Sequence, residues 1–229
     1  MSVTAVHSQA GDRPYWFTLE QGKLYFRNGE YGRALLSFEE ARRQKEAIYS
    51  RMEAALIDLL SLPEVRRMDD SLPRIEAYIA ERGHINAANA LQELYYRCPR
   101  ENFNGSAQAA LEKIGELKLY PEAEYWLGEV YRTEGELSIA LGQYRKAHDA
   151  RDLLEIPGFD LEILYKIAEL RRLRREFNEM EETYQEILSQ DTLWIQDADS
   201  FMRRAMARTM ENDGLDRFLA MYRYNNGAA

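Results

Sequence analysis

Three segments of the chain share one pattern of apolar and small residues. In each, two stretches with apolar residues at helical spacing flank a short polar break. A small residue in the first stretch precedes a small or medium-sized residue in the second by twelve positions in all three segments. The paired positions are Gly22 and Ala34, Gly128 and Ala140, and Ala168 and Met180. Equal steps at three places predict a structural unit that the chain repeats.

The residue types within this unit predict a helical hairpin. Gly29 and Gly135 lie in the break, where a glycine can adopt the left-handed conformation that ends a helix. The small residues let the two helix backbones approach each other. Aromatic side chains fill the flanking volume, and they are Tyr25, Phe38, Tyr131 and Tyr144. One hairpin cannot bury its own apolar face, so neighbouring hairpins must stack.

The segments resemble tetratricopeptide (TPR) repeats, whose pattern has Leu-Gly and Tyr on the first helix and Ala, Phe and Ala on the second. The resemblance covers residues 14–47, 121–152 and 161–191. The sequence departs from the family at its usual opening Trp, which falls on Thr18, Glu124 and Leu164, and Arg171 replaces Tyr in the third segment. The resemblance implies an all-α fold in which stacked antiparallel helix pairs form a superhelical domain, an α-solenoid.

Between the first two segments the pattern is weaker. Gly22 and Gly128 are 106 positions apart, close to three periods of about 34 residues, so we expect two degenerate repeats at about 48–118. A continuous apolar stripe predicts one long helix over Arg33–Leu62, interrupted in its pattern by Lys45. A turn at Gly83 predicts a following helix, and Ser106 to Leu119 predicts another.

These segments predict one repeat domain over residues 14–225. Residues 1–13 are expected to be a flexible N-terminal tail or the remnant of a signal peptide. Asn212-Asp213-Gly214 separates two amphipathic stretches at about 197–224. We expect them to form a helix pair that caps the array, because a terminal repeat needs a more polar outer face.

Composition and charge narrow the class of protein. Of 229 residues, 45% are hydrophobic, and 13 Gly and 6 Pro are too few for a turn-rich all-β fold. The net charge of −9 opposes binding to nucleic acid or to anionic lipid. The most basic stretch, residues 171–175, has acidic neighbours at helical spacing, so we interpret it as an ion-paired, solvated helix face.

The compartment stays open at this stage. Cys98 is the single cysteine, so it cannot form an internal disulfide, and a buried hydrophobic role suits it best. No apolar run is long enough to span a bilayer. Residues 2–10 are small, nearly uncharged and followed by Gly11-Asp12, as at the end of a secretory signal. The protein is cytoplasmic if translation starts at Met1, and exported or periplasmic if it starts upstream.

No motif in the sequence predicts catalysis, a metal or a cofactor. There is no Gly-rich phosphate loop, no His-Glu-x-x-His and no Gly-x-Ser-x-Gly. His7, His84 and His148 match no nucleophile signature. Asn104-Gly105-Ser106 fits a glycosylation acceptor, but a loop that ends in a serine helix cap explains it more simply.

The resemblance implies a partner-binding groove lined by the first helix of each pair. Its expected lining is Trp16, Leu19, Lys23 and Phe26 in the first segment, Tyr125, Glu129 and Arg132 in the second, and Tyr165, Glu169 and Arg172 in the third. Aromatic and arginine side chains of this kind dominate interface energetics. The alternative is that Tyr125 and Tyr165 pack against the adjacent repeat. Glu129 and Glu169 would repel a C-terminal carboxylate, which argues against the subfamily that captures one.

Three classes of function follow, in order of preference. The first is a non-catalytic scaffold or adaptor that binds a protein or peptide segment, as a homo-oligomer or as part of a larger assembly. The second is a carrier of a small apolar ligand, which would need a closed pocket. The third is an enzyme, which would need a titratable group with a perturbed pKa in a cleft.

Overall fold

The computed structural model describes residues 13–68, 71–98, 106–156 and 158–190. Throughout these ranges the ordered elements are helices. The expected capping pair at 197–224 and the possible signal remnant at residues 2–10 lie outside the described residues. Contacts divide the chain into two compact units, Met1–Tyr120 and Pro121–Ala229, where the sequence predicted one array over 14–225.

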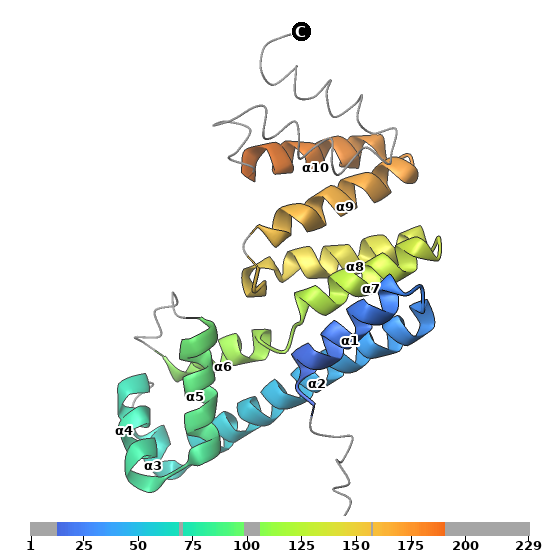
Figure 1. Cartoon of the computed structure of the whole chain (residues 1–229). Helices are drawn as coiled ribbons and strands as arrows, with labels where there is room; N and C mark the ends of the chain where they lie inside the picture. Colours follow the sequence, from blue (N-terminus) through green and yellow to red (C-terminus); the bar gives the residue numbers. More distant parts are fainter. Residues whose placement is uncertain (1–12, 69–70, 99–105, 157, 191–229) are drawn as a thin grey trace, which may run out of the picture. The chain divides into compact units, whose positions relative to one another are not determined.

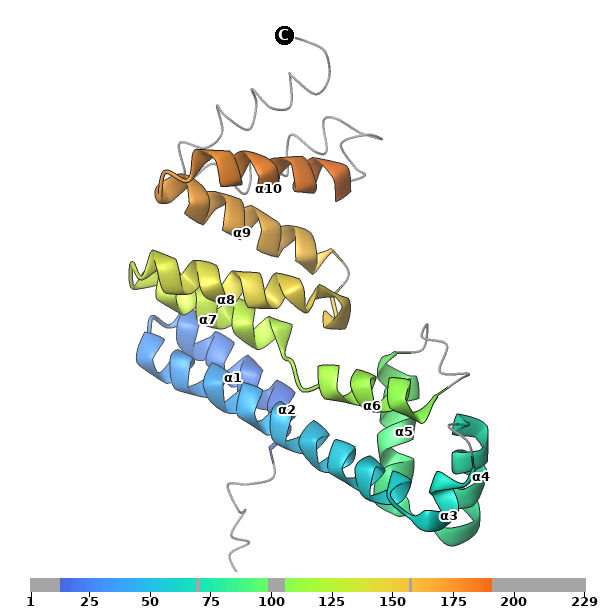
Figure 2. The same cartoon turned by 180° about the vertical axis from the view of Figure 1, so that it is seen from behind.

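The first unit is organised around one long helix. Helix α2 (Tyr31–Leu60) has 30 residues, which confirms the long helix that the apolar stripe predicts. Helix α1 (Tyr15–Arg27) packs along its first half, and α5 (Ile85–Arg97) and α6 (Ala107–Glu116) pack against its second half (Figures 1 and 2). The short α3 (Pro63–Arg66) and α4 (Leu72–Arg82) lead into α5.

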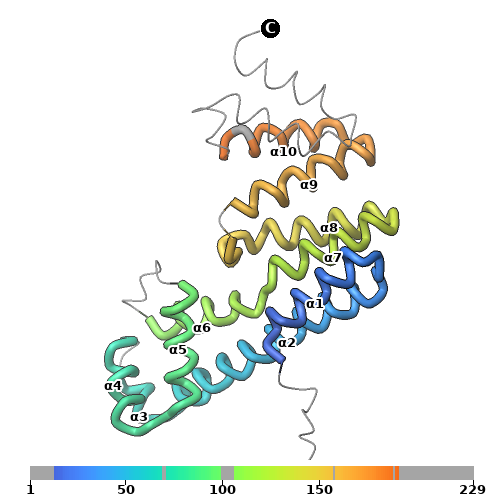
Figure 3. Tube along the Cα trace, viewed as in Figure 1, coloured from blue at the N-terminus to red at the C-terminus, as the bar shows by residue number. Residues whose placement is uncertain are grey.

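The second unit is a run of paired helices. Helix α7 (Pro121–Thr133) packs against α8 (Leu137–Asp149), and α9 (Phe159–Leu173) packs against both α8 and α10 (Phe177–Gln190). A single 3-10 turn, Arg151–Leu153, follows α8. The trace in Figure 3 shows the chain reversing direction from each of these helices to the next.

Three hairpin turns share one geometry. The residue at the turn has a positive φ in each case, 77° at Gly29, 83° at Gly135 and 62° at Arg175. Its N–H and the next N–H return to carbonyl groups three and five residues back along the chain, as Gly29 to Phe26 and Glu30 to Tyr25 illustrate. The repeat that the sequence predicts is therefore present in the backbone, with arginine where two turns have glycine.

Close helix approach explains the small residues at the repeat positions. A Cβ atom on Gly22 would lie 2.5 Å from the Phe38 ring, and one on Gly128 would lie 2.7 Å from the Tyr144 ring. A methyl group cannot occupy either place without displacing an aromatic ring that is fully buried. The glycine and the aromatic residue therefore form one packing unit in each hairpin.

The degenerate region contains the helices that the sequence predicts. Gly83 ends α4 with a left-handed φ of 67°, and α5 starts two residues later. The Ser106 hydroxyl accepts a hydrogen bond from the Ala109 N–H at 3.0 Å, so this serine caps α6. Helix α6 packs on α2 and α5 rather than forming a hairpin with a helix of its own. The fold is all-α, with adjacent helices packed in pairs, as expected.

Candidate functional site

The predicted groove residues do not share one exposed surface. Leu19, Tyr125, Glu129 and Tyr165 are buried, with 4 to 6% of their surface exposed. Trp16 is 53% exposed. The side chains between these extremes are half-buried, and they are Lys23, Phe26, Arg132, Glu169 and Arg172. The expectation that all ten line an open groove is therefore corrected for the four buried residues.

Tyr125 belongs to the core of the second unit. Its ring centroid lies 4.7 Å from that of Phe159 and 5.6 Å from that of Tyr144. The surrounding cluster also contains Ile163, Ile167 and other apolar residues of α8 and α9. The alternative interpretation from the sequence, packing against the adjacent repeat, describes this tyrosine.

Glu129 is the centre of a buried polar network. Its carboxylate accepts hydrogen bonds from the Tyr144 hydroxyl and from the Arg132 guanidinium at 2.9 Å, and the Lys166 ammonium lies 3.3 Å away. Burial alone would raise the pKa of Glu129, but Lys166, Arg132 and Tyr144 together outweigh burial and lower it. An ionised carboxylate thus links α7, α8 and α9, and it faces no open groove.

A second polar cluster lies inside the first unit. Lys45 is only 4% exposed, and its ammonium lies 4.6 Å from the Tyr120 ring centre and 5.8 Å from that of Tyr15. Attraction of a cation to aromatic faces offsets part of its desolvation. Lys45, which interrupts the apolar stripe of the sequence, is therefore a buried residue of α2 that packs against Tyr15 of α1 and against Tyr120.

The same cluster extends onto α5. The Tyr49 hydroxyl donates to Glu93 at 2.7 Å, and Arg97 donates both to Glu93 at 3.0 Å and to the Tyr15 hydroxyl at 2.7 Å. Burial and the bond to Glu93 raise the pKa of Tyr49. These contacts fix α5 against α1 and α2, and so determine which face of α5 is left outward.

The outward faces of α4 and α5 form an open apolar groove of about 390 Å³. Its lining is mostly apolar or small, and consists of Glu76, Ile79, Ala80, Ala88, Leu91, Gln92 and Tyr95. Glu76 is the charged residue among them. Ile79 and Leu91 are buried, while Ala80 and Tyr95 are exposed. We call this surface the α4–α5 groove.

Glu76 and Tyr95 lie at the end of the α4–α5 groove that is farther from the Gly83 turn. Burial and a hydrogen bond to the Glu76 carboxylate raise the pKa of Tyr95 to about 12. Glu76 is on α4 and Tyr95 on α5, so the bond crosses the groove. At the other end, near the Gly83 turn, the lining residues are the small Ala80 and Ala88.

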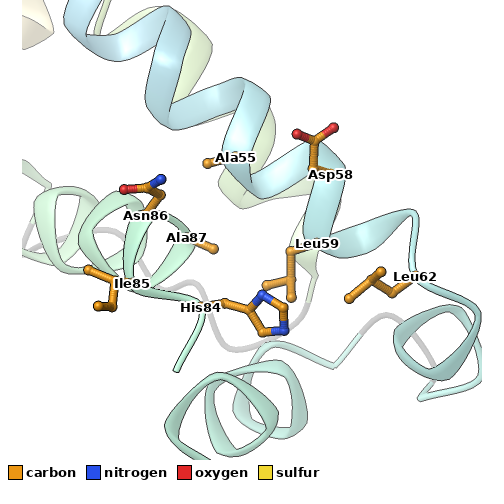
Figure 4. Close-up of a pocket in the computed structure, with 8 residues that line it drawn as sticks. All are labelled: Ala55, Asp58, Leu59, Leu62, His84, Ile85, Asn86 and Ala87. Carbon is orange, nitrogen blue, oxygen red and sulfur yellow. The ribbon is translucent and has the colours of Figure 1, made fainter. Parts of the chain in front are cut away.

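A smaller pocket of about 270 Å³ lies between the end of α2 and the start of α5. Figure 4 shows the Asp58 carboxylate and the His84 ring pointing away from each other. The His84 ring instead stacks on Tyr78, with centroids 5.7 Å apart. The two titratable groups on this pocket do not form an acid–base pair.

The basic stretch at residues 171–175 makes contacts within its own hairpin. Arg174 pairs with Glu176 at 2.7 Å, and Arg171 donates to the Glu179 carbonyl at 2.6 Å and to the Thr183 hydroxyl. The basic stretch is thus engaged within its own hairpin at these two positions. In the part of the chain that the structure describes, no cluster of His, Cys, Asp or Glu could hold a metal ion, and no helix is long and apolar enough to cross a membrane.

Sequence reasoning missed the α4–α5 groove. The signal that could have found it is a set of small and apolar residues at helical spacing on two helices joined by Gly83: Ile79 and Ala80 before the turn, and Ala88, Leu91 and Tyr95 after it. The repeat pattern is weaker in this region than in the three hairpins, so the sequence favoured the hairpins as the binding surface.

Comparison with known proteins finds a relative of undescribed function. The chain is 27% identical over 218 residues to a protein of Treponema pallidum (strain Nichols) that is described only as uncharacterized. The match covers 94% of this chain and 58% of that protein, so the chain spans little more than half the length of this curated relative. No protein-family profile matches the sequence. No solved structure matches it.

Proposed function

We propose that the protein is a non-catalytic, TPR-like scaffold that binds a segment of another protein. Its helix pairs would supply a rigid support, and the α4–α5 groove would supply the binding surface. The proposal departs from the sequence expectation in the location of that surface. A groove on the first helices of the best repeats has four of its ten residues buried in helix packing, whereas the α4–α5 groove is open.

The observation that carries the proposal is the apolar character of an uncovered surface. Tyr95 is 43% exposed, and Ala80 on the other wall of the groove is exposed as well. Concave, mostly apolar surfaces with a few polar groups are where proteins most often bind their ligands and partners. Exposed aromatic residues are also the most effective anchors at interfaces.

The shape of the groove favours a protein segment over a small ligand. Carriers of small apolar molecules enclose them and remove most of their surface from water. The α4–α5 groove is not enclosed, and Ala80, Gln92 and Tyr95 in its lining are exposed. A partner that extends beyond the groove can cover these residues, which a small molecule cannot do.

A pair of neighbouring substitutions on α5 tests the proposal. Ala88 lies in the groove, and Asn89 is the exposed residue next to it on the same helix, outside the groove. Ala88→Arg should abolish capture of a specific partner from the native cell, as identified by mass spectrometry. Asn89→Arg should leave that partner bound, because its side chain points elsewhere around the helix.

Both variants must keep the fold of the parent protein. Circular dichroism and melting temperature must agree between both variants and the parent, so that loss of capture reports the surface and not the fold. If no specific partner is captured by the parent, or if both variants capture it equally, the groove is not the binding surface. Retention of a small apolar molecule by the parent protein, lost in Ala88→Arg, would favour the carrier function instead.

A further inference from the structure

Resting on the proposed function, we propose that the partner of the α4–α5 groove is an amphipathic helix carrying a Lys or Arg one turn from its central apolar residue. The cation would pair with Glu76, and the apolar residue would fill the space over Ala80 and Ala88.

The walls of the groove select a helix over an extended strand. Both walls are helices, α4 and α5, whose backbone groups bond within the helices. An extended segment binds best beside a sheet edge, where free backbone groups complete a ladder. A helix satisfies its own backbone and brings only side chains to the surface, so it suits walls that offer only side chains.

The small residues determine where the helix approaches most closely. Ala80 and Ala88 line the groove near the Gly83 turn, one on each wall, with apolar Ile79 and Leu91 beside them. Side chains this short leave room for one bulky apolar side chain from the partner. The partner's central Leu, Ile or Phe therefore belongs at this end.

Charge determines the orientation. Glu76 lies four residues, or about 6 Å along α4, from Ala80. Tyr95 donates its hydroxyl hydrogen bond to the Glu76 carboxylate, so this carboxylate acts as an acceptor at the edge of the groove. The other lining residues are uncharged. A cation on the partner therefore gains most at this end, one helical turn from the apolar anchor.

Two synthetic peptides of identical composition provide the test. Both are helical and place Leu at positions i, i+3, i+4 and i+7. One carries its lysine at i+8, four residues after the Leu at i+4 and beside the apolar face, and the isomer carries it on the opposite face. Fluorescence anisotropy of the labelled peptides gives the dissociation constants with the full-length protein. The first peptide should bind more tightly, by about two- to fivefold, as expected for a partly exposed ion pair.

Charge reversal identifies the residue responsible. Glu76→Gln should weaken the first peptide by a similar factor and leave the isomer unchanged. Glu76→Lys should recover tight binding when the peptide lysine is replaced by glutamate. Ala88→Leu, which fills the space for the apolar anchor, should weaken both peptides, and Asn89→Leu should weaken neither.

Specific results would overturn the inference. Equal binding of the two isomers, or Glu76→Gln binding as the parent does, removes Glu76 as the determinant. If neither peptide binds, the partner is not an amphipathic helix of this kind. The proposed function would still be supported if the parent protein captures a native partner that the Ala88→Arg variant does not capture. Sedimentation that shows a dimer of the parent, dissociated by Ala88→Arg, would identify a second copy of this chain as the occupant.

Discussion

The Tyr144 hydroxyl donates a hydrogen bond to the Glu129 carboxylate in the interior of the second unit. The same tyrosine ring packs against Gly128, one residue earlier on α7. One side chain of α8 therefore holds two consecutive residues of α7, one through ring packing and the other through its hydroxyl. The first hairpin has Phe38 at the equivalent place, and its ring packs against Gly22 in the same way, but phenylalanine has no hydroxyl to donate.

Glu129→Gln should destabilise the second unit by about 2 to 4 kcal/mol. The substitution keeps the size of the side chain but removes the charge that Lys166 and Arg132 face. Thermal or urea unfolding measures the loss. Glu134→Gln, at an exposed position in the following turn, is the matched control and should change stability little.

The effect of Glu129→Gln should depend on pH in a defined direction. The pKa of Glu129 is lowered in the folded protein from its ordinary value of 4.5, because Lys166, Arg132 and Tyr144 outweigh its burial. Its stabilising contribution is therefore complete above about pH 4.5 and is lost as the pH falls through the folded pKa. The difference between parent and variant should be constant near pH 7 and shrink on acidification below about pH 4.5. A difference that grows on acidification would contradict the assigned charge state.

Two glycines in one hairpin should respond to alanine with opposite signs. Gly128→Ala should destabilise by about 1 to 3 kcal/mol, because the new methyl group would clash with the Tyr144 ring. Gly142 lies within α8 with nothing near its would-be Cβ, so Gly142→Ala should stabilise by about 0.5 to 1 kcal/mol. Chemical denaturation of both variants is the measurement. Equal effects would mean that only helix propensity matters at Gly128.

The repeat pattern predicted the hairpins because their signals are local. A glycine at a turn and a small residue facing an aromatic ring a short distance along the chain can be read directly, as Gly22, Ala34 and Phe38 show. The burial of Glu129 could not be read in this way. It depends on Lys166, 37 positions away on another helix, and only the packing of α9 on α8 brings the two together.

Tyr125→Ala and Trp16→Ala should separate core from surface. Tyr125 packs on Phe159 and Tyr144, so its truncation should cost about 3 to 5 kcal/mol. Trp16 is more than half exposed, so its truncation should cost far less. The melting temperatures of the two variants, compared with that of the parent, measure both losses. No loss for Tyr125→Ala would restore the sequence expectation that both residues line a groove, whereas a large loss for Trp16→Ala would place Trp16 in the core.

The α4–α5 groove was not predicted for a related reason. Its residues give a helical pattern, and the sequence alone assigns such a pattern to the interior. Whether Tyr95 and Ala88 face inward depends on how α5 is rotated about its axis. That rotation is fixed by the contacts of Glu93 with Tyr49 and of Arg97 with Tyr15. These contacts link residues 44 and 82 positions apart, which no local pattern reveals.

Arg175→Gly should stabilise the third hairpin. Arg175 holds a φ of 62°, a conformation that costs a residue with a Cβ about 1 kcal/mol or more and costs glycine almost nothing. The side chain is exposed, so little packing is lost. We expect a gain of about 1 kcal/mol in the free energy of unfolding. The reverse change in the equivalent turn, Gly135→Ala, should cost a similar amount, because nothing lies near its would-be Cβ and only the backbone conformation is affected. If both substitutions shift the unfolding midpoint in the same direction, the two turns do not share the geometry described.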